Sequence, residues 1–277
     1  MTPADVAAAE AVARTALYAR TDEAGAAVIE RGRRRVGHLQ RTDPGGAWVA
    51  ERDGEVVGVA LALVREGVWR FSLFAVAPAL QGRGVGRTLL EASFEYGRDA
   101  RGHLILSTES PAAMRRYARL GLELRPCVAA AGIVDPARRP AADGVRDATA
   151  DANAIATADA IGRAVRGAGH ARDLPVLLEA SGSRLLLCDD RAFAVVRDDR
   201  IALVAGTDED AATRVLNGAF ATARPGATVT VDFLTAGQDW AVRACLDAGL
   251  SLSPDGPLFA RGDVGPLRPY IPSGAYL

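Results

Sequence analysis

The residues best suited to chemistry form a glycine-rich turn, which reads Gln81-Gly82-Arg83-Gly84-Val85-Gly86-Arg87-Thr88. The turn follows an apolar stretch that ends at Val76, and a helical pattern begins within it. Such a turn leaves backbone N–H groups free at a helix N-terminus, where the helix dipole also favours anions. Glycines let the backbone approach a phosphate closely, and the two arginines add positive charge. The segment therefore predicts a phosphate-binding site.

Two familiar kinds of phosphate site do not fit this turn. All 33 basic residues are Arg, so a P-loop, which needs a Lys before Ser or Thr, is excluded. The lack of Lys also excludes a Schiff-base lysine and lysine self-acylation. The dinucleotide-binding fingerprint fails because the glycine spacing differs and no acidic residue is evident on a following strand. A plain structural turn remains the alternative.

A second patterned stretch, from Ser110 to Leu122, makes the turn more specific. Together the two segments resemble the GNAT superfamily of acetyl-CoA-dependent N-acyltransferases. The pyrophosphate motif of that superfamily, Q/R-x-x-G-x-G/A, is matched by Gln81, Gly84 and Gly86. Its later motif, N-x-x-A-x-x-x-Y-x-x-x-G-F, is matched at Ala113, Tyr117 and Gly121, with Ser110 and Leu122 as mild replacements. The resemblance covers residues 1–135 strongly.

The resemblance implies acetyl-CoA as the acyl donor. Backbone amides of the turn would hold its pyrophosphate, and the strand before the turn would pair with the pantetheine arm like an added strand. One N–H group of that strand would also polarise the thioester carbonyl. The cofactor-binding residues implied are Phe74, Ala75, Val76, Gln81, Gly82, Arg83, Gly84, Val85, Gly86, Arg87, Thr88 and Ser110.

By the same resemblance, Tyr117 is the catalytic residue and the general acid. A phenol has a reference pKa near 10 and can donate a proton to a departing thiolate. The alternative is a buried aromatic residue on a helix face. The general base departs from the family pattern, because residues 68–73 contain no carboxylate. We interpret Glu109 as a structural residue. The other candidates for the general base are a chain of water molecules and the C-terminus. Trp69 and Arg70 are candidates for the acceptor side.

The plan of the first half recurs in the second. Five positions, Ser110, Ala113, Tyr117, Gly121 and Leu122, have counterparts 128 positions later at Gln238, Ala241, Cys245, Gly249 and Leu250. The glycine loop is not repeated: Thr207 and Asp210 form a capping box, and three acids occupy the first helical turn. Those acids would repel a pyrophosphate. The second half is therefore interpreted as a scaffold, an acceptor-site wall or a dimerisation surface.

These observations predict an α/β (α+β) fold with two tandem GNAT-like domains. Each domain has a central mixed, mostly antiparallel sheet flanked by helices. The first domain covers residues 1–135, a linker covers 136–144, and a degenerate second domain covers 145–277 with a Pro- and Gly-rich tail. The length of 277 residues fits two such domains.

Composition narrows the partners. The net charge is -1, so no basic excess indicates nucleic acid or an anionic membrane. The three cysteines are far apart and predict neither a zinc site nor a disulfide framework, and we expect no metal. No stretch is long enough to span a membrane, and the N-terminus lacks the pattern of a signal peptide, so we expect a cytoplasmic protein.

We expect an N-acetyltransferase that moves an acyl group to a primary amine of a small molecule or peptide by direct attack. The alternatives are an acyl-CoA-binding sensor without turnover and a scaffold that binds a partner protein. A homodimer is a further option that the sequence leaves open. The C-terminal tail either packs across the cleft of the first domain, with the Leu277 carboxylate at the acceptor site, or stays on its own domain. The first arrangement resembles that of the enhanced-intracellular-survival acetyltransferases.

Overall fold

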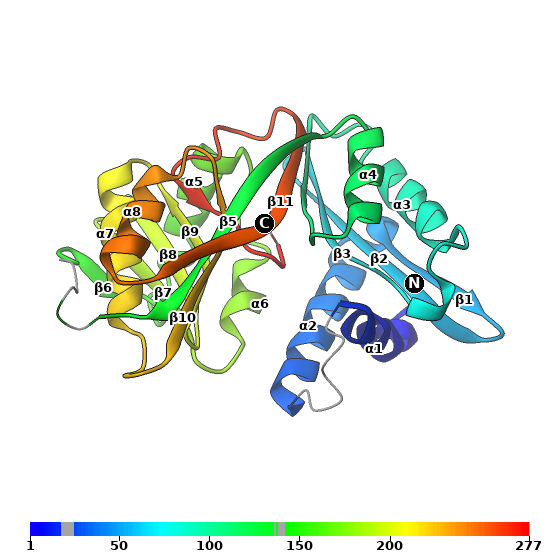
Figure 1. The fold of residues 1–277 in the computed structure, drawn as a ribbon, viewed down its shortest axis with the longest axis horizontal. Helices are drawn as coiled ribbons and strands as arrows, with labels where there is room; N and C mark the ends of the chain where they lie inside the picture. Colours follow the sequence, from blue (N-terminus) through cyan, green and yellow to red (C-terminus); the bar gives the residue numbers. More distant parts are fainter. Residues whose placement is uncertain (18–24, 136, 138–141, 277) are drawn as a thin grey trace. The chain divides into compact units, whose positions relative to one another are not determined.

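A computed structural model describes residues 1–17, 25–135, 137 and 142–276 (Figure 1). The chain divides into two compact units, Met1–Arg101 and Gly102–Leu277. We describe each unit by itself. The glycine-rich turn lies in the first unit, and the Tyr117 motif lies in the second.

The first unit is a three-stranded antiparallel sheet between helices. Its order is β1-β2-β3. Asp53 and Gly54 both have positive φ, as a tight hairpin of β1 and β2 requires. The bounds are η1 Pro3–Asp5, α1 Val6–Leu17, α2 Ala26–Thr42, η2 Pro44–Gly46, β1 Ala47–Arg52, β2 Glu55–Arg65, β3 Val68–Val76, η3 Pro78–Leu80 and α3 Val85–Tyr96. The sequence predicts a helix from about Asp22 to Leu39; the observed α2 begins at Ala26, and residues 22–24 lie outside the described residues.

Trp69 is a core residue of β3. Its side chain is wholly buried, its indole N–H donates to the Ser93 carbonyl of α3 over 3.0 Å, and its ring packs edge-on against Phe94. Arg70, next on β3, is also wholly buried. Both candidates for the acceptor side are thus buried, and their contact with an acceptor stays a prediction.

The second unit holds one mixed sheet, ordered β4-β11-β5-β10-β9-β8-β7-β6, with β12 paired to β9. The strands are β4 Gly102–Leu106, β5 Glu123–Ile133, β6 Val145–Asp147, β7 Ser183–Cys188, β8 Ala192–Arg197, β9 Arg200–Gly206, β10 Thr228–Thr235, β11 Ser251–Gly262 and β12 Tyr270–Ile271. The helices are α4 Pro111–Arg119, α5 Ala154–Arg166, α6 Leu174–Leu178, α7 Glu209–Ala221 and α8 Asp239–Asp247. β6, α6 and β12 have no counterpart in the sequence-based expectation.

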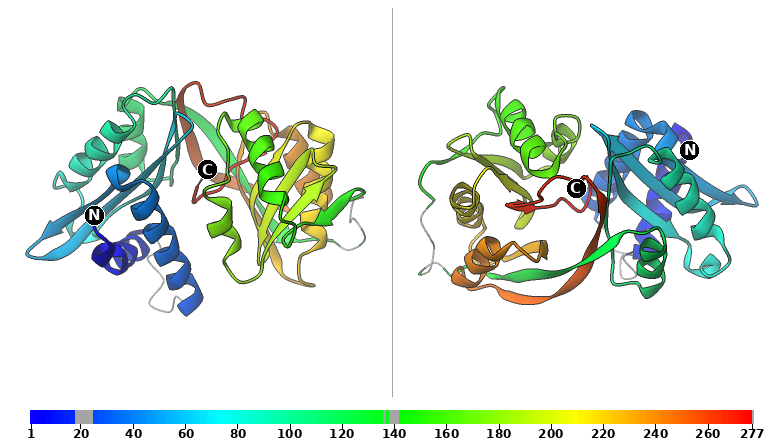
Figure 2. Two further views of the ribbon diagram at one scale, coloured as in Figure 1. Left: turned by 180° about the vertical axis from the view of Figure 1, so that it is seen from behind. Right: turned by 90° about the horizontal axis from the view of Figure 1, so that it is seen from above.

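The structure confirms the predicted repeat and shows where its two copies exchange strands. α4 and α8 are both nine residues long and start 128 positions apart, as do β5 and β11. β11 lies between β4 and β5, and β5 lies between β11 and β10. The long strands β5 and β11 run side by side in both views (Figures 1 and 2). Each copy thus places its last strand beside a strand of the other copy.

The exchange has a local two-fold centre. Cys127 on β5 pairs with Asp255 on β11, and these two residues are themselves 128 positions apart. A bulge interrupts the ladder beside this pair. The two compact units meet at Arg101 and Gly102 in the sequence. The linker at residues 136–144, which the sequence predicts between the two copies of the repeat, stays a prediction.

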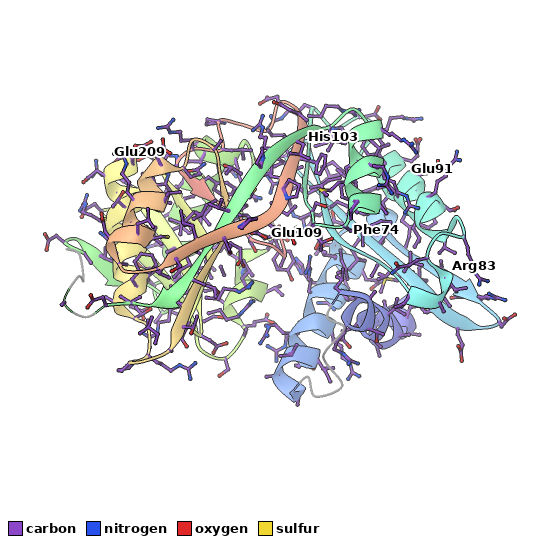
Figure 3. The ribbon with its side chains drawn as sticks, in the orientation of Figure 1. Phe74, Arg83, Glu91, His103, Glu109 and Glu209 are labelled. Carbon is purple, nitrogen blue, oxygen red and sulfur yellow. The ribbon has the colours of Figure 1, made fainter. Side chains whose placement is uncertain are left out.

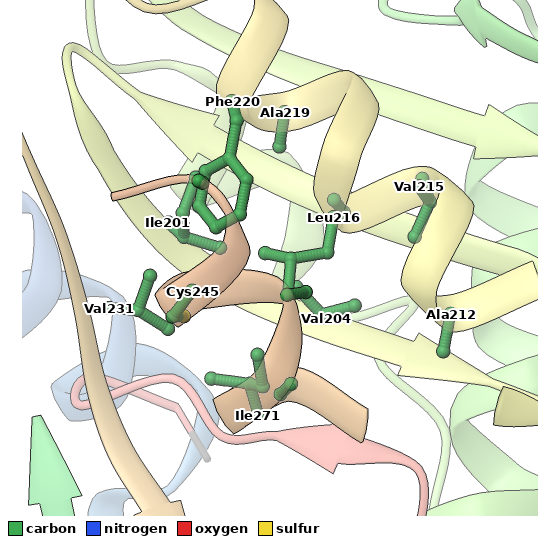
Figure 4. Packing of buried hydrophobic residues seen from close by; sticks show 14 of the residues in the cluster. Ile201, Val204, Ala212, Val215, Leu216, Ala219, Phe220, Val231, Cys245 and Ile271 are labelled. Carbon is green, nitrogen blue, oxygen red and sulfur yellow. The ribbon is translucent and has the colours of Figure 1, made fainter. Parts of the chain in front are cut away.

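Helices cover both faces of the second sheet. α7 and α8 pack on the face that carries Val204 and Val231, where a buried apolar cluster forms around Leu216 and Phe220 (Figure 4). On the opposite face, His170, which lies between α5 and α6, packs edge-on against Phe193 of β8. Alternate residues of a strand face opposite sides, so β7, β8 and β9 are apolar on both faces and almost wholly buried.

Candidate active site

The glycine-rich turn forms an open cradle at the N-terminus of α3. Gly82 and Gly84 have φ of 77° and 91°, a backbone conformation that residues with a side chain rarely adopt. A Cβ atom at either position would meet nothing within 4 Å. Gly84 is the N-cap of α3, and no side chain caps this end of the helix among the described residues. The first N–H groups of α3 therefore remain available to an anion.

The arginines of the turn are exposed. Figure 3 shows Arg83 at the turn and Glu91 on α3. The Arg87 guanidinium is bound to the Glu91 carboxylate one helical turn away, at 2.7 Å. That hydrogen bond raises the pKa of Arg87 further above its usual value. Arg87 thus shares its charge with Glu91.

The end of β3 turns part of its backbone away from β2. The Ala77 N–H donates to the Val57 carbonyl over 2.9 Å. Backbone groups of successive strand residues point to alternate sides, so those of Val76 and Phe74 point away from β2. The Gln81 side chain reaches this edge, and its Nε2 donates to the Val76 carbonyl over 3.0 Å. Turn and strand are thereby joined by a side chain of the motif.

The second motif lies on α4, in the second unit. Ser110 is the exposed N-cap, and its hydroxyl accepts the Ala113 N–H at 3.5 Å. Tyr117 is 4% exposed and packs edge-on against Phe259 of β11. Burial raises the pKa of Tyr117 far above its usual value of 10, opposed only weakly by Arg116. The phenol therefore stays protonated at physiological pH.

Few described groups are placed to act as a general base. β3 carries no carboxylate, and Glu109 is exposed in the segment that follows β4 (Figure 3). Leu277, whose carboxylate was a candidate, lies outside the described residues. His38, His103 and His170 are buried. The described residues hold no group of three His, Cys, Asp or Glu side chains suited to a metal ion.

The corresponding helix start in the second copy is closed to anions. Asp208 is the N-cap of α7, and its carboxylate accepts the Ala211 N–H at 2.9 Å. The predicted capping partner of Thr207, Asp210, instead pairs with Arg191 and Arg214. Glu209 adds a further acid to the first turn. Carboxylates therefore already satisfy the helix dipole at this end.

A strand of the C-terminal tail, β12, pairs with the end of β9, which corresponds by the repeat to the end of β3. Val204 lies 128 positions after Val76, and β12 pairs with it through Ile271, next to the Tyr270 and Ala205 pair. Ile271 is wholly buried within the cluster of α7 and α8 (Figure 4). Residues 270–271 of the tail therefore pair within the second unit. The expectation that the Leu277 carboxylate lies at the acceptor site concerns a residue outside the described ones and stays a prediction.

Gln238, the counterpart of Ser110, fixes this docked tail. Its Nε2 donates to the Leu267 carbonyl over 2.6 Å, and its Oε1 accepts the Tyr270 N–H at 3.1 Å. Arg268 of the tail pairs with Glu209 at 2.6 Å. The tail thus pairs with β9 and is joined by an ion pair to the first turn of α7. The corresponding helix start in the first copy, that of α3, has no side-chain cap among the described residues.

A family model for the acetyltransferase (GNAT) family matches residues 11–122. This match includes both motifs on which the resemblance was based. This segment of the chain is therefore similar to the GNAT family of acetyltransferases, as the motifs predicted. Among curated proteins, no relative of the sequence was found. Among the described residues, no helix is long and apolar enough to cross a membrane.

Solved structures share the fold over nearly the whole chain. A putative acetyltransferase from Pyrococcus horikoshii is 19% identical, with a TM-score of 0.78 over 100% of this chain and 94% of its own. A GCN5-related N-acetyltransferase from Kribbella flavida is 17% identical, with a TM-score of 0.60 over 95% and 70%. One from Sphaerobacter thermophilus is 18% identical, with a TM-score of 0.58 over 95% and 94%. The predicted fold class of two tandem GNAT-like domains is thereby confirmed.

Proposed function

We propose that the protein transfers an acetyl group from acetyl-CoA to a primary amine of a small molecule or peptide, and that only its first copy does so. The observation that carries this proposal is the open cradle at α3. Gly82 and Gly84 hold a left-handed backbone with free space around them, and no side chain occupies the helix start among the described residues. These features fit a pyrophosphate, because they offer N–H groups without steric or electrostatic competition.

In this proposal, acetyl-CoA supplies the activated acetyl group. The backbone from Gln81 to Thr88 binds its pyrophosphate, with Arg83 and Arg87 contributing positive charge. The outward backbone groups of Phe74 and Val76 bind the pantetheine arm as an added strand would. A backbone N–H of this segment stabilises negative charge on the thioester oxygen as the amine attacks. Ala75 and Ser110 complete the set that we assign to the donor.

We assign the general acid role to Tyr117. Its position in the motif supports the role, and its raised pKa keeps the proton on the phenol at every physiological pH. A thiolate has a reference pKa near 8.5, so the proton moves fully only if bound donor changes the surroundings of the phenol. The first contribution of Tyr117 is therefore a hydrogen bond to the departing sulfur.

A donor-binding sensor without turnover is the second candidate. The absence of a carboxylate from β3 favours it, because the amine must lose a proton before it attacks. Under this alternative the cradle binds acetyl-CoA, yet no amine accelerates thiol release.

The test is thiol release from acetyl-CoA in the presence of a panel of primary amines, with the wild type and Tyr117→Phe. We expect amine-dependent release by the wild type and a loss of roughly 100-fold in kcat for Tyr117→Phe, with acetyl-CoA affinity unchanged. The ring of Phe keeps the packing on Phe259, so the variant should fold. Because burial raises the pKa of Tyr117, the wild-type rate should show no loss from this group up to about pH 10. Binding of acetyl-CoA without turnover for any amine would favour the sensor.

A further inference from the structure

The guanidinium of Arg35 on helix α2 binds Ser72 of β3. Arg35 is half-buried on α2, and its Nε donates to the Ser72 hydroxyl over 3.0 Å. Its Nη2 donates to the Ser72 carbonyl oxygen. One planar group thus binds both acceptors of a single residue, a geometry that the fork of an Arg side chain provides and that of Lys does not.

Ser72 is the extra residue of a bulge. The register between β2 and β3 passes from Leu61 opposite Leu73 to Ala62 opposite Phe71, so Ser72 is the residue added between these two pairs. A bulge bends its strand and re-aims the residues beside it. The guanidinium of Arg35 is bound to this bulged residue through both its hydroxyl and its carbonyl oxygen.

The bulge lies just before the part of β3 that we propose binds the pantetheine arm of acetyl-CoA. Phe74, whose backbone groups turn away from β2, follows Ser72 by two residues. Hydrogen-bond donors that stabilise a developing oxyanion must be aimed closely, and a displacement of about 1 Å can cost roughly 100-fold in rate. The angle at which the strand leaves the bulge therefore sets where the following N–H groups point.

We propose that Arg35 is a positioning residue for acyl transfer. By holding Ser72, it fixes the bulge of β3 so that the N–H groups after the bulge point at the acetyl carbonyl of the donor. This inference rests on the proposed function and adds to it a residue outside both family motifs. In this proposal Arg35 acts on the donor through the strand that it holds.

The variants that test this are Arg35→Ala, Arg35→Lys and Ser72→Ala, with Arg34→Ala as the matched control. Arg34 is the neighbouring residue on α2, and its side chain is exposed and paired with Glu30 at 3.0 Å. Two quantities are measured with acetyl-CoA: the split between kcat and KM in the thiol-release assay, and the ¹³C chemical shift of the bound acetyl carbonyl in [1-¹³C]acetyl-CoA. The carbonyl shift needs no acceptor amine and reports polarisation directly.

For Arg35→Ala we expect kcat to fall by roughly 10- to 100-fold while KM for acetyl-CoA changes by less than about threefold. The bound carbonyl signal should move toward its position in free acetyl-CoA. Arg35→Lys should fall between Arg35→Ala and wild type, and Ser72→Ala, which keeps the carbonyl acceptor, should lose less than Arg35→Ala. Arg34→Ala should match wild type.

A bound carbonyl shift and a kcat in Arg35→Ala equal to those of Arg34→Ala, with both variants binding acetyl-CoA, would overturn the inference and leave the proposed function standing. If Arg35→Ala does not fold, Arg35→Lys decides by the same two readouts. A wild type that binds no acetyl-CoA would overturn the proposed function, and this inference with it.

Discussion

At the scale of single residues, Gln81 joins the glycine-rich turn to the end of β3, where we propose that acetyl-CoA binds. Its amide donates to the Val76 carbonyl, at the strand end where we propose that the pantetheine arm binds. We predict that Gln81→Ala weakens acetyl-CoA binding roughly fivefold, because one net hydrogen bond contributes about 1 kcal/mol. Gln81→Glu should weaken it more, since a carboxylate cannot donate to Val76 and repels the pyrophosphate. Isothermal titration measures both, and an affinity of Gln81→Glu equal to wild type would contradict this role.

Residue spacing predicted the parts of the candidate site that lie in continuous motifs. Gln81, Gly84 and Tyr117 could be assigned because a turn and a helix fix their spacing locally. Arg35 could not, since its contact with Ser72 depends on how α2 packs against β3 and on a bulge in the register with β2. The burial of Trp69 was missed for a similar reason, because the face that a strand residue occupies depends on its register.

At the scale of elements, the tail strand β12 is part of the second unit's core. Ile271 is wholly buried against α7 and α8, so Ile271→Ala should cost about 2–5 kcal/mol of unfolding free energy. Arg268→Ala, which removes an exposed ion pair, should cost less than about 1 kcal/mol and is the matched control on the same segment. Neither change should alter acetyl-CoA affinity. Denaturant unfolding measures the free energy, and isothermal titration measures the acetyl-CoA affinity. Weaker acetyl-CoA binding in Ile271→Ala but not in Arg268→Ala would indicate that the tail contributes to the active site.

The order of elements could be predicted from the sequence, but their pairing could not. Apolar runs and turn residues located β1, β2 and β3 within a residue or two. The sequence predicts shorter strands here, about Ala129–Val134 and about Pro257–Arg261, than the observed β5 and β11. Each observed strand contains proline, which weakens the strand pattern. Pro126 and Pro257 fall at the bulge where the ladder between these strands is interrupted. The exchange of β5 and β11 between copies joins segments more than 100 residues apart, and nothing local in the sequence specifies it.

At the scale of the whole molecule, the exchange makes the two copies interdependent. A chain of residues 1–135 would contain β4 and β5 without β11, which lies between them, and without β10, which pairs with the other edge of β5. We predict that this fragment aggregates or stays partly unfolded, because unpaired strand edges and their apolar faces are exposed. Circular dichroism and size-exclusion chromatography, with the full chain as the control, measure this. A monomeric, cooperatively folding fragment would contradict the exchange.

We propose that only the first of the two similar copies binds acetyl-CoA, because the tail and the acids of α7 close the helix start of the second. Isothermal titration of the full chain with acetyl-CoA tests it most directly, with Gly84→Asp as the paired variant. Gly84→Asp places a carboxylate in the cradle and strains a left-handed backbone, whereas the second copy is unchanged. We expect one acetyl-CoA per chain for wild type and none for Gly84→Asp. Two per chain in the wild type, or one per chain remaining in Gly84→Asp, would contradict the account.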